Sequence, residues 1–263
     1  MKINYKKIQL VVAIAFLASL AGISQGVEVL QWSGEMTGGV FDDASGNGNT
    51  GDIAGTATNA PGLIGNAIYL DGGASTLVQN WGTVGLPTLA ANSWSMNAYV
   101  KLDVAAENWA QIYNFGSAGY DTKNRGLVGV IEGGNPADVR FVTSSAGDDQ
   151  LWTGSLWDVG VWHMFTVTCD GANITMYRDG TQIGTEPYNS GAGTITLVDG
   201  DPRAMVGRSP WNQRIEGLVD EFTIWDNTLT QGEITVLAQA LVPEPATMLI
   251  MSSFIFAFIL RRK

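Results

Sequence analysis

Apolar and polar positions alternate in short segments along most of this chain, and turn residues separate the segments. The period of two that a β-strand requires recurs in nine places: residues 67–72, 93–102, 111–116, 126–134, 138–144, 161–169, 173–180, 204–208 and 214–225. Asp-Gly at 71–72, 170–171 and 179–180, and Asn-Pro at 135–136, mark tight turns between them. This pattern predicts an all-β chain.

The stretch from 161 to 182 shows the pattern most clearly. In VWHMFTVTC the side chains of Phe165, Val167 and Cys169 share one strand face. The Asp-Gly turns at 170–171 and 179–180 each reverse the direction of the chain. This predicts three consecutive antiparallel strands, the local unit of a sandwich sheet. Cys169 is the only cysteine, so no intramolecular disulfide can form. We expect it to be a small buried hydrophobe.

One segment of the body fits a helix instead. In TQGEITVLAQAL, residues 230–241, Thr230 stands three positions before Glu233 and just before the apolar Ile234 and Leu237. This spacing is that of a capping box. We expect one short helix near residues 230–240. With no internal repeat and no long linker, residues 27–241 are predicted to form a single domain.

The amino-terminal end has the layout of a secretory signal. Residues 1–7 are basic, residues 8–23 are almost continuously apolar, and small residues follow in SLAGISQG. We expect a signal helix within residues 1–26 that is removed on export. Cleavage after Ala21 and cleavage after Gly26 both satisfy the requirement for small residues.

The carboxyl-terminal end, residues 242–263, predicts a membrane anchor. Residues 246–260 are apolar or small and carry no charge; as a helix they cover ~22 Å, somewhat less than a ~30 Å hydrocarbon core. Arg261, Arg262 and Lys263 follow, and the positive-inside rule keeps them in the cytoplasm. We therefore expect a transmembrane helix over 246–260 and a body exported to the cell envelope or extracellular matrix.

Pro243, Glu244 and Pro245, the apolar helix and the terminal basic cluster, in that order, resemble the PEP-CTERM sorting signal. The resemblance implies that an exosortase, a membrane-embedded transpeptidase-like enzyme, recognises this tail and cuts near the motif. Such tails occur on many unrelated passenger domains, so this one predicts an address and not an activity.

The body is strongly acidic. Of 14 Lys and Arg and 25 Asp and Glu in the whole chain, residues 27–241 hold 8 and 24, a formal charge of 8 − 24 = −16. Such a surface repels phosphate backbones, so nucleic acid is not an expected partner. Neutral polysaccharides and divalent cations are compatible with it.

Four stretches of the body resemble the LamG (laminin-G-like) family of concanavalin A-like lectin/glucanase jelly-rolls. They are FDDASGNGNTG (41–51), GLIGNAIYLDG (62–72), VWHMFTVTCDGANITMYRDGTQIG (161–184) and IEGLVDEFTIWDNTLTQGEITVL (215–237). The resemblance covers residues 27–241 and implies a two-sheet antiparallel jelly-roll sandwich with one short C-terminal helix. It also implies a fold that is often a non-catalytic binding module.

Glucanases of this fold place carboxylates at alternating positions of one strand, Glu-x-Asp-x-Glu, so that all point into the cleft. This sequence has no such run. In the nearest, EGLVDE, the alternation predicts Glu216 and Asp220 on one face, ~13 Å apart, and Glu221 on the other. His163 is the only histidine, and we expect it to form a local hydrogen bond within a strand. We therefore predict no catalytic residues and a protein that is not an enzyme.

The resemblance implies calcium as a cofactor, because LamG-like jelly-rolls often bind it. The candidate ligands are Asp43, Asn47 and Asn49 in the glycine-rich loop and Asp220 in the last strand, whose oxygens suit this ion. A bound ion would link the start and end of the domain. Two plainer interpretations stay open: a surface loop whose side chains bond their own backbone, and an Asp220 that only bonds backbone amides.

Aromatic side chains in loop-like contexts are candidates for stacking on sugar rings. We expect one or two of four tryptophans to be exposed for this purpose: Trp81, Trp109, Trp157 and Trp211. The favoured function is an exported, non-catalytic surface or matrix protein that binds a polysaccharide or surface glycan. A purely structural or adhesive component of an exopolysaccharide matrix and a divergent glycoside hydrolase are the alternatives.

Overall fold

The computed structural model describes residues 26–73, 77–80, 93–105, 110–115, 125–132, 138–144, 148–153, 158–187, 204–207 and 214–241. The predicted signal and the predicted helix over 246–260 lie outside these residues. None of the helices within them is long and apolar enough to cross a membrane.

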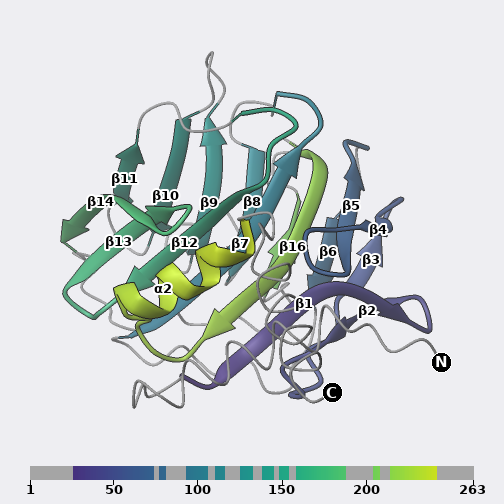
Figure 1. Ribbon diagram of the computed structural model, residues 1–263, viewed down its shortest axis with the longest axis horizontal. Coiled ribbons are helices and arrows are strands. Elements are labelled where there is room, and N and C mark those ends of the chain that lie inside the picture. The colour runs from purple at the N-terminus through teal and green to yellow at the C-terminus, as the bar shows by residue number, and fades with distance from the viewer. Residues whose placement is uncertain are drawn as a thin grey trace, which may run out of the picture.

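Two antiparallel sheets build the domain (Figure 1). The larger sheet, which we call sheet A, has the order β14-β13-β12-β7-β16-β1-β2, with β5 beside β16 and β4 beside β5. Its strands are β1 (Glu28–Thr37), β2 (Val40–Asp43), β4 (Thr58–Pro61), β5 (Asn66–Asp71), β7 (Trp94–Leu102), β12 (His163–Cys169), β13 (Asn173–Arg178), β14 (Thr181–Pro187) and β16 (Glu216–Trp225).

The second sheet, sheet B, has the order β11-β10-β9-β8-β15-β6-β3. Its strands are β3 (Asp52–Ala54), β6 (Leu77–Asn80), β8 (Ala110–Phe115), β9 (Arg125–Glu132), β10 (Asp138–Ser144), β11 (Asp148–Thr153) and β15 (Ala204–Val206). The prediction of a two-sheet antiparallel jelly-roll sandwich is confirmed, and so are the three consecutive strands β12, β13 and β14.

Strand β1 lies between β16 and β2 in sheet A, and strict alternation does not predict it. Its register with β16 shifts between Glu28 and Leu30, so Val29 and Leu30 are both buried in the core. Such a bulge interrupts the period of two. The pattern of buried positions therefore resembles no regular strand.

An aromatic cluster joins the two sheets across the core. Tyr113 of sheet B stacks on Phe222 of sheet A with ring centroids 5.3 Å apart, and its centroid lies 6.0 Å from that of Phe165. The ring of Trp32 is tilted against that of Phe222, with the two centroids 5.6 Å apart. The same core holds Cys169, which confirms that residue as a buried hydrophobe.

The hydroxyl of Tyr113 lies in this core with no hydrogen-bond partner, and burial raises the pKa of the phenol well above its usual range. We expect Tyr113→Phe to raise the free energy of unfolding by about 1 kcal/mol, because it removes a buried donor that bonds to nothing and keeps the ring. Urea unfolding of both proteins measures this difference. A loss of stability would show that the hydroxyl has a partner, such as a buried water.

Helix α2 (Gln231–Ala238), continued by the 3₁₀ turn η1 (Gln239–Leu241), lies across the outer face of sheet A, over β12, β7 and β16 (Figure 1). Thr230 and Glu233 form the predicted capping box. Ile234 is fully buried, in a second apolar cluster with residues of the sheet, among them Tyr99, Met164 and Trp225. The Tyr99 hydroxyl donates to the Leu237 carbonyl at 2.6 Å, which ties the end of the helix to the sheet.

Candidate functional site

The glycine-rich loop after β2 is organised around the carboxylate of Asp43. Its Oδ1 accepts from the backbone N–H of Gln31 at 2.9 Å, and from the backbone N–H and hydroxyl of Ser45 at 3.1 and 2.6 Å. Its Oδ2 accepts from the Asn49 N–H at 2.8 Å. Four donors therefore converge on the carboxylate that the sequence assigns to calcium.

The two asparagines of the loop are also engaged. Asn47 Nδ2 donates to the carbonyls of Glu28 and Val29 at 2.8 and 3.1 Å, and Asn49 Nδ2 donates to the Val29 carbonyl at 2.9 Å. The Asn49 carbonyl accepts from Trp32 Nε1 at 2.8 Å. These bonds attach the loop to the bulge of β1, whereas the plainer interpretation has the side chains of the loop bond their own backbone.

Asp43→Ala is expected to lower the free energy of unfolding by about 2 kcal/mol, since it removes the acceptor of four hydrogen bonds that organise the loop and join it to β1. Asp42→Ala is the matched control. Asp42 accepts one bond, from the Thr37 hydroxyl at an exposed position, so its loss is expected to change stability by less than about 0.5 kcal/mol. Equal effects of the two substitutions in chemical unfolding would contradict the central role of Asp43.

Asp220 lies elsewhere, on the outer face of β16 and beneath the turn that precedes β5. Its side chain is 0% exposed, and Oδ2 accepts from the Ile64 N–H at 2.8 Å. A Cβ placed on Gly62 would lie 2.6 Å from the same oxygen, so glycine allows the turn to approach closely. Asp220 Oδ1 is buried and has no hydrogen-bond partner.

Glu221 joins Asp220 on this face, which corrects the prediction that the two point to opposite faces. Glu221 has a left-handed backbone with φ 48°, and the register of β16 with β7 shifts between Asp220 and Thr223. The resulting bulge breaks the alternation. Its Oε2 lies 2.5 Å from Gln31 Nε2, and Gln31 faces away from the core because Leu30 and Trp32 face into it.

The buried pair has unusual electrostatics. Burial, and then the charge of Glu221, raises the pKa of Asp220 to about 8, although backbone N–H groups oppose the shift. Burial and the same two carboxylates raise the pKa of the Tyr99 phenol as well. A positive charge at Asp220 Oδ1 would offset this penalty. Glu221 is only 8% exposed, so neither acid is open to a polysaccharide chain.

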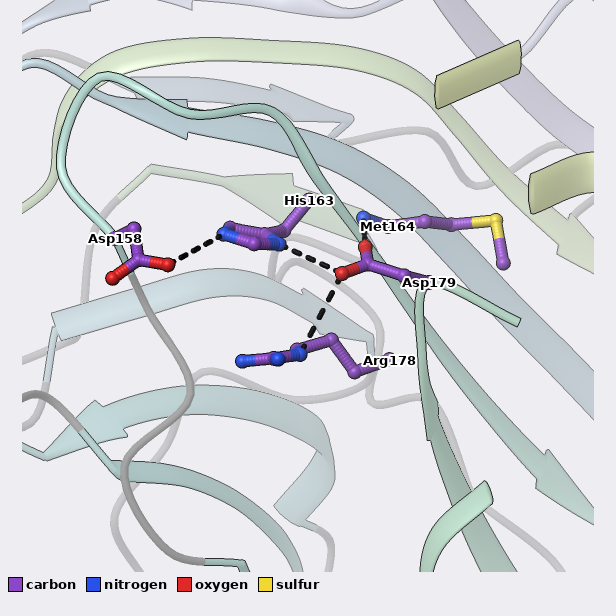
Figure 2. A network of polar contacts seen from close by, with 5 residues as sticks. All are labelled: Asp158, His163, Met164, Arg178 and Asp179. Carbon is purple, nitrogen blue, oxygen red and sulfur yellow. Dashed lines mark hydrogen bonds and ion pairs between the residues drawn. The ribbon is translucent and has the colours of Figure 1, made fainter. Parts of the chain in front are cut away.

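Figure 2 shows the second polar network, at the start of β12. His163 Nδ1 donates to Asp179 Oδ2 at 2.8 Å, and Nε2 lies 3.9 Å from Asp158 Oδ2. Asp179 Oδ1 accepts from the Met164 N–H at 2.8 Å, and Arg178 Nε lies 3.5 Å from Oδ2. The local hydrogen bond predicted for His163 is confirmed, and it joins β12 to the β13–β14 turn.

The remaining sequence candidates lie outside the described residues. They are the sorting motif Pro243, Glu244 and Pro245 and the tryptophans Trp81, Trp109, Trp157 and Trp211. Within the described part of the chain, no three His, Cys, Asp or Glu side chains lie close enough to share a metal ion. The residues that sequence reasoning missed are Glu221, Tyr99 and Gly62, and the glycines of GLIGN at 62 and 65 are the one signal that a close approach occurs there.

Comparison with known proteins agrees with the observed fold. The family model described as the concanavalin A-like lectin/glucanases superfamily (Laminin_G_3) matches residues 71–235, more than half of the chain. The chain belongs to this family. The match includes β16 with its acid pair and most of helix α2.

Solved structures share the fold of this concanavalin A-like domain. Domain 4 of AbnA, an extracellular arabinanase from Geobacillus stearothermophilus solved with arabinotriose, has a TM-score of 0.61 at 18% identity and covers 82% of this chain and 100% of that chain. The binding domain of Paraclostridial Mosquitocidal Protein 1 has a TM-score of 0.61 at 15% identity, with 80% and 51% covered. The botulinum neurotoxin serotype D/C binding domain has a TM-score of 0.60 at 14% identity, with 82% and 52% covered.

The chain thus spans about half the length of the two toxin domains. A search of curated proteins found no match.

Proposed function

We propose that this is an exported, non-catalytic surface or matrix protein that binds carbohydrate through its concanavalin A-like domain. The observation that carries the proposal is the match to domain 4 of the arabinanase, all of which this chain covers, because that domain was solved with arabinotriose. The binding domains of the two toxins share the same fold. Recognition by a folded surface is the property these neighbours have in common.

The burial of Asp220 and Glu221 supports a non-catalytic role for this pair. Hydrolysis of a glycosidic bond needs two acids that flank the sugar, about 5–10 Å apart and open to the substrate. Asp220 and Glu221 are adjacent and buried beneath the 62–65 turn. Asp220 and Glu221 therefore contribute to the packing of the fold and are not accessible to a substrate.

The test is a glycan array probed with purified residues 27–241, including polysaccharides from the producing organism's own biofilm. We expect binding to one class of polysaccharide, without release of reducing ends over prolonged incubation. Binding to no glycan would favour the structural or adhesive alternative. Release of reducing sugar from a bound polysaccharide would favour the other alternative, a divergent glycoside hydrolase.

We also propose that the body is exported and held outside the membrane by the helix over 246–260 until an exosortase processes the tail. The support is the order of the sequence features: basic and apolar segments at the start, then Pro243, Glu244 and Pro245, an apolar segment and a basic end. Mass spectrometry of the native protein should find the amino-terminal segment missing. Full-length protein in the cytosol would contradict both parts.

Calcium binding is a third proposal, and it centres on Asp220. Asp220 Oδ1 is a buried acceptor without a donor, whereas Asp43 already accepts four bonds. An ion that binds only the folded state stabilises it, so calcium should raise the thermal midpoint of the wild type and leave that of Asp220→Asn unchanged. An identical thermal midpoint of the wild type in calcium and in chelator would contradict calcium binding.

A further inference from the structure

The polypeptide enters the sandwich at Val27, whose backbone is tied to the end of β16. Val27 N donates to Asp226 Oδ1 at 3.0 Å, and the Asp226 N–H donates to the Val27 carbonyl at 3.2 Å. Glu28, the next residue, begins β1 and is paired with Trp225. The carboxylate of Asp226 therefore lies beside the nitrogen of Val27 at the point where the chain joins the domain.

The residue before Val27 has almost no room. A Cβ placed on Gly26 would lie 1.3 Å from Asn227 Oδ1 and 2.0 Å from Asn227 Cγ. No other residue can occupy position 26 in this conformation without displacing Asn227. Position 26 of the folded domain thus fits glycine, and a larger residue there would displace the Asn227 side chain.

The sequence allows two cleavage positions, and the apolar segment distinguishes them. Ala21 lies within the apolar run over residues 8–23, whereas Gly26 lies beyond its end, with the small residue Ser24 two positions earlier. A signal peptidase cuts after the apolar region, at a site with small residues in these two positions. Cleavage after Gly26 satisfies both requirements and leaves the apolar run intact.

We propose that a signal peptidase cleaves between Gly26 and Val27, and that the new α-ammonium group of Val27 binds the Asp226 carboxylate. Water adds across the peptide bond: the released peptide ends in the Gly26 carboxylate, and the mature protein begins with the Val27 ammonium. The inference rests on the proposed export. It adds the position of the cut and a role for Asp226 in holding the new terminus.

The surroundings of Val27 favour a positive charge. Burial, and then the charge of Asp43, raises the pKa of the Glu28 carboxyl, which shows that negative charge is already disfavoured there. An ammonium group at Val27 would place a positive charge beside these carboxylates and convert its hydrogen bond to Asp226 into a charge-assisted one.

Amino-terminal sequencing and intact mass of the protein secreted by a bacterial host test the cut. We expect Val27 as the first residue. A processed protein that begins at Gly22, or at any residue other than Val27, overturns this inference and leaves the export proposal standing. Secreted protein that retains Met1 overturns the signal on which both depend.

The Gly26→Ala variant provides an independent test. Alanine is accepted before the cut, so the mature protein should have the same mass and the same thermal midpoint as the wild type. If the cut falls after Ala21 instead, the mature protein will be one methylene heavier, and the new Cβ will meet Asn227 and lower the midpoint. That result would overturn the inference.

The ion pair is tested with Asp226→Asn in the mature protein. At about pH 6 the variant should melt about 2 °C below the wild type, because it lacks the charge that faces the ammonium group. The difference should shrink above about pH 9, where an α-amino group has lost its proton. A difference that is the same at both pH values indicates an ordinary hydrogen bond and overturns the ammonium pairing.

Discussion

Trp32→Ala is expected to lower the free energy of unfolding by about 3–5 kcal/mol, as truncation of a fully buried aromatic side chain does. Trp32 is 0% exposed and packs on Phe222, which stacks in turn on Tyr113 of the other sheet. The substitution opens a cavity between the sheets. It also strands the Asn49 carbonyl, which accepts from the indole N–H at 2.8 Å. Urea unfolding followed by circular dichroism measures the loss.

Trp32→Phe separates the two contributions. It keeps most of the ring volume and removes only the bond to Asn49, so we expect a loss of about 1–2 kcal/mol. If the two variants were equally destabilised, the hydrogen bond to the loop would account for the whole effect. If Trp32→Ala had no effect, the position of Trp32 in the core would be wrong.

Asp220→Asn is expected to stabilise the metal-free protein at high pH, by on the order of 3 kcal/mol at pH 8. The folded protein holds the pKa of Asp220 at about 8, against 3.8 for an ordinary aspartate. Asparagine has the shape of the protonated acid and can accept the Ile64 N–H bond, but it never ionises. Chemical unfolding at several pH values, in the presence of a chelator, measures the effect.

The sign of the pH dependence follows from the direction of that shift. A raised folded-state pKa means that the folded protein binds the proton more tightly than the unfolded chain does. The contribution of protonated Asp220 to the free energy of unfolding is therefore fully present below pH 3.8 and is lost as the pH rises through about 8. The wild type and Asp220→Asn should be similarly stable near pH 4 and diverge above it.

Asp103→Asn makes the same chemical change at an exposed position and serves as the control. Parallel pH profiles for wild type and Asp220→Asn would contradict the protonated acid.

The fold follows from the sequence to a large extent, because strand alternation and turn chemistry are local. Asp170 is one example: its Oδ1 accepts from the N–H groups of Asn173 and Ala172, which lowers its pKa and closes the β12–β13 hairpin at the predicted place. The capping box of Thr230 is another. Each depends on residues within four positions of one another, so the sequence contains everything that decides them.

The candidate site depends on contacts that are remote in sequence. Asp220 meets Ile64, 156 positions away, and Gln31 meets Glu221 across 190. Alternation assigns Glu221 to the wrong face because a bulge is set by the pairing of β16 with two neighbours, β5 and then β1. The glycine-rich loop likewise contains candidate calcium ligands. The fold brings β1 against this loop, and the backbone of β1 forms hydrogen bonds with the Asp43 carboxylate and with the side-chain amides of Asn47 and Asn49.

The sequence by itself determined the all-β class, the hairpins and the capped helix. Only the tertiary structure decided which carboxylates are buried together and which are already satisfied, because long-range packing controls both their solvation and their partners.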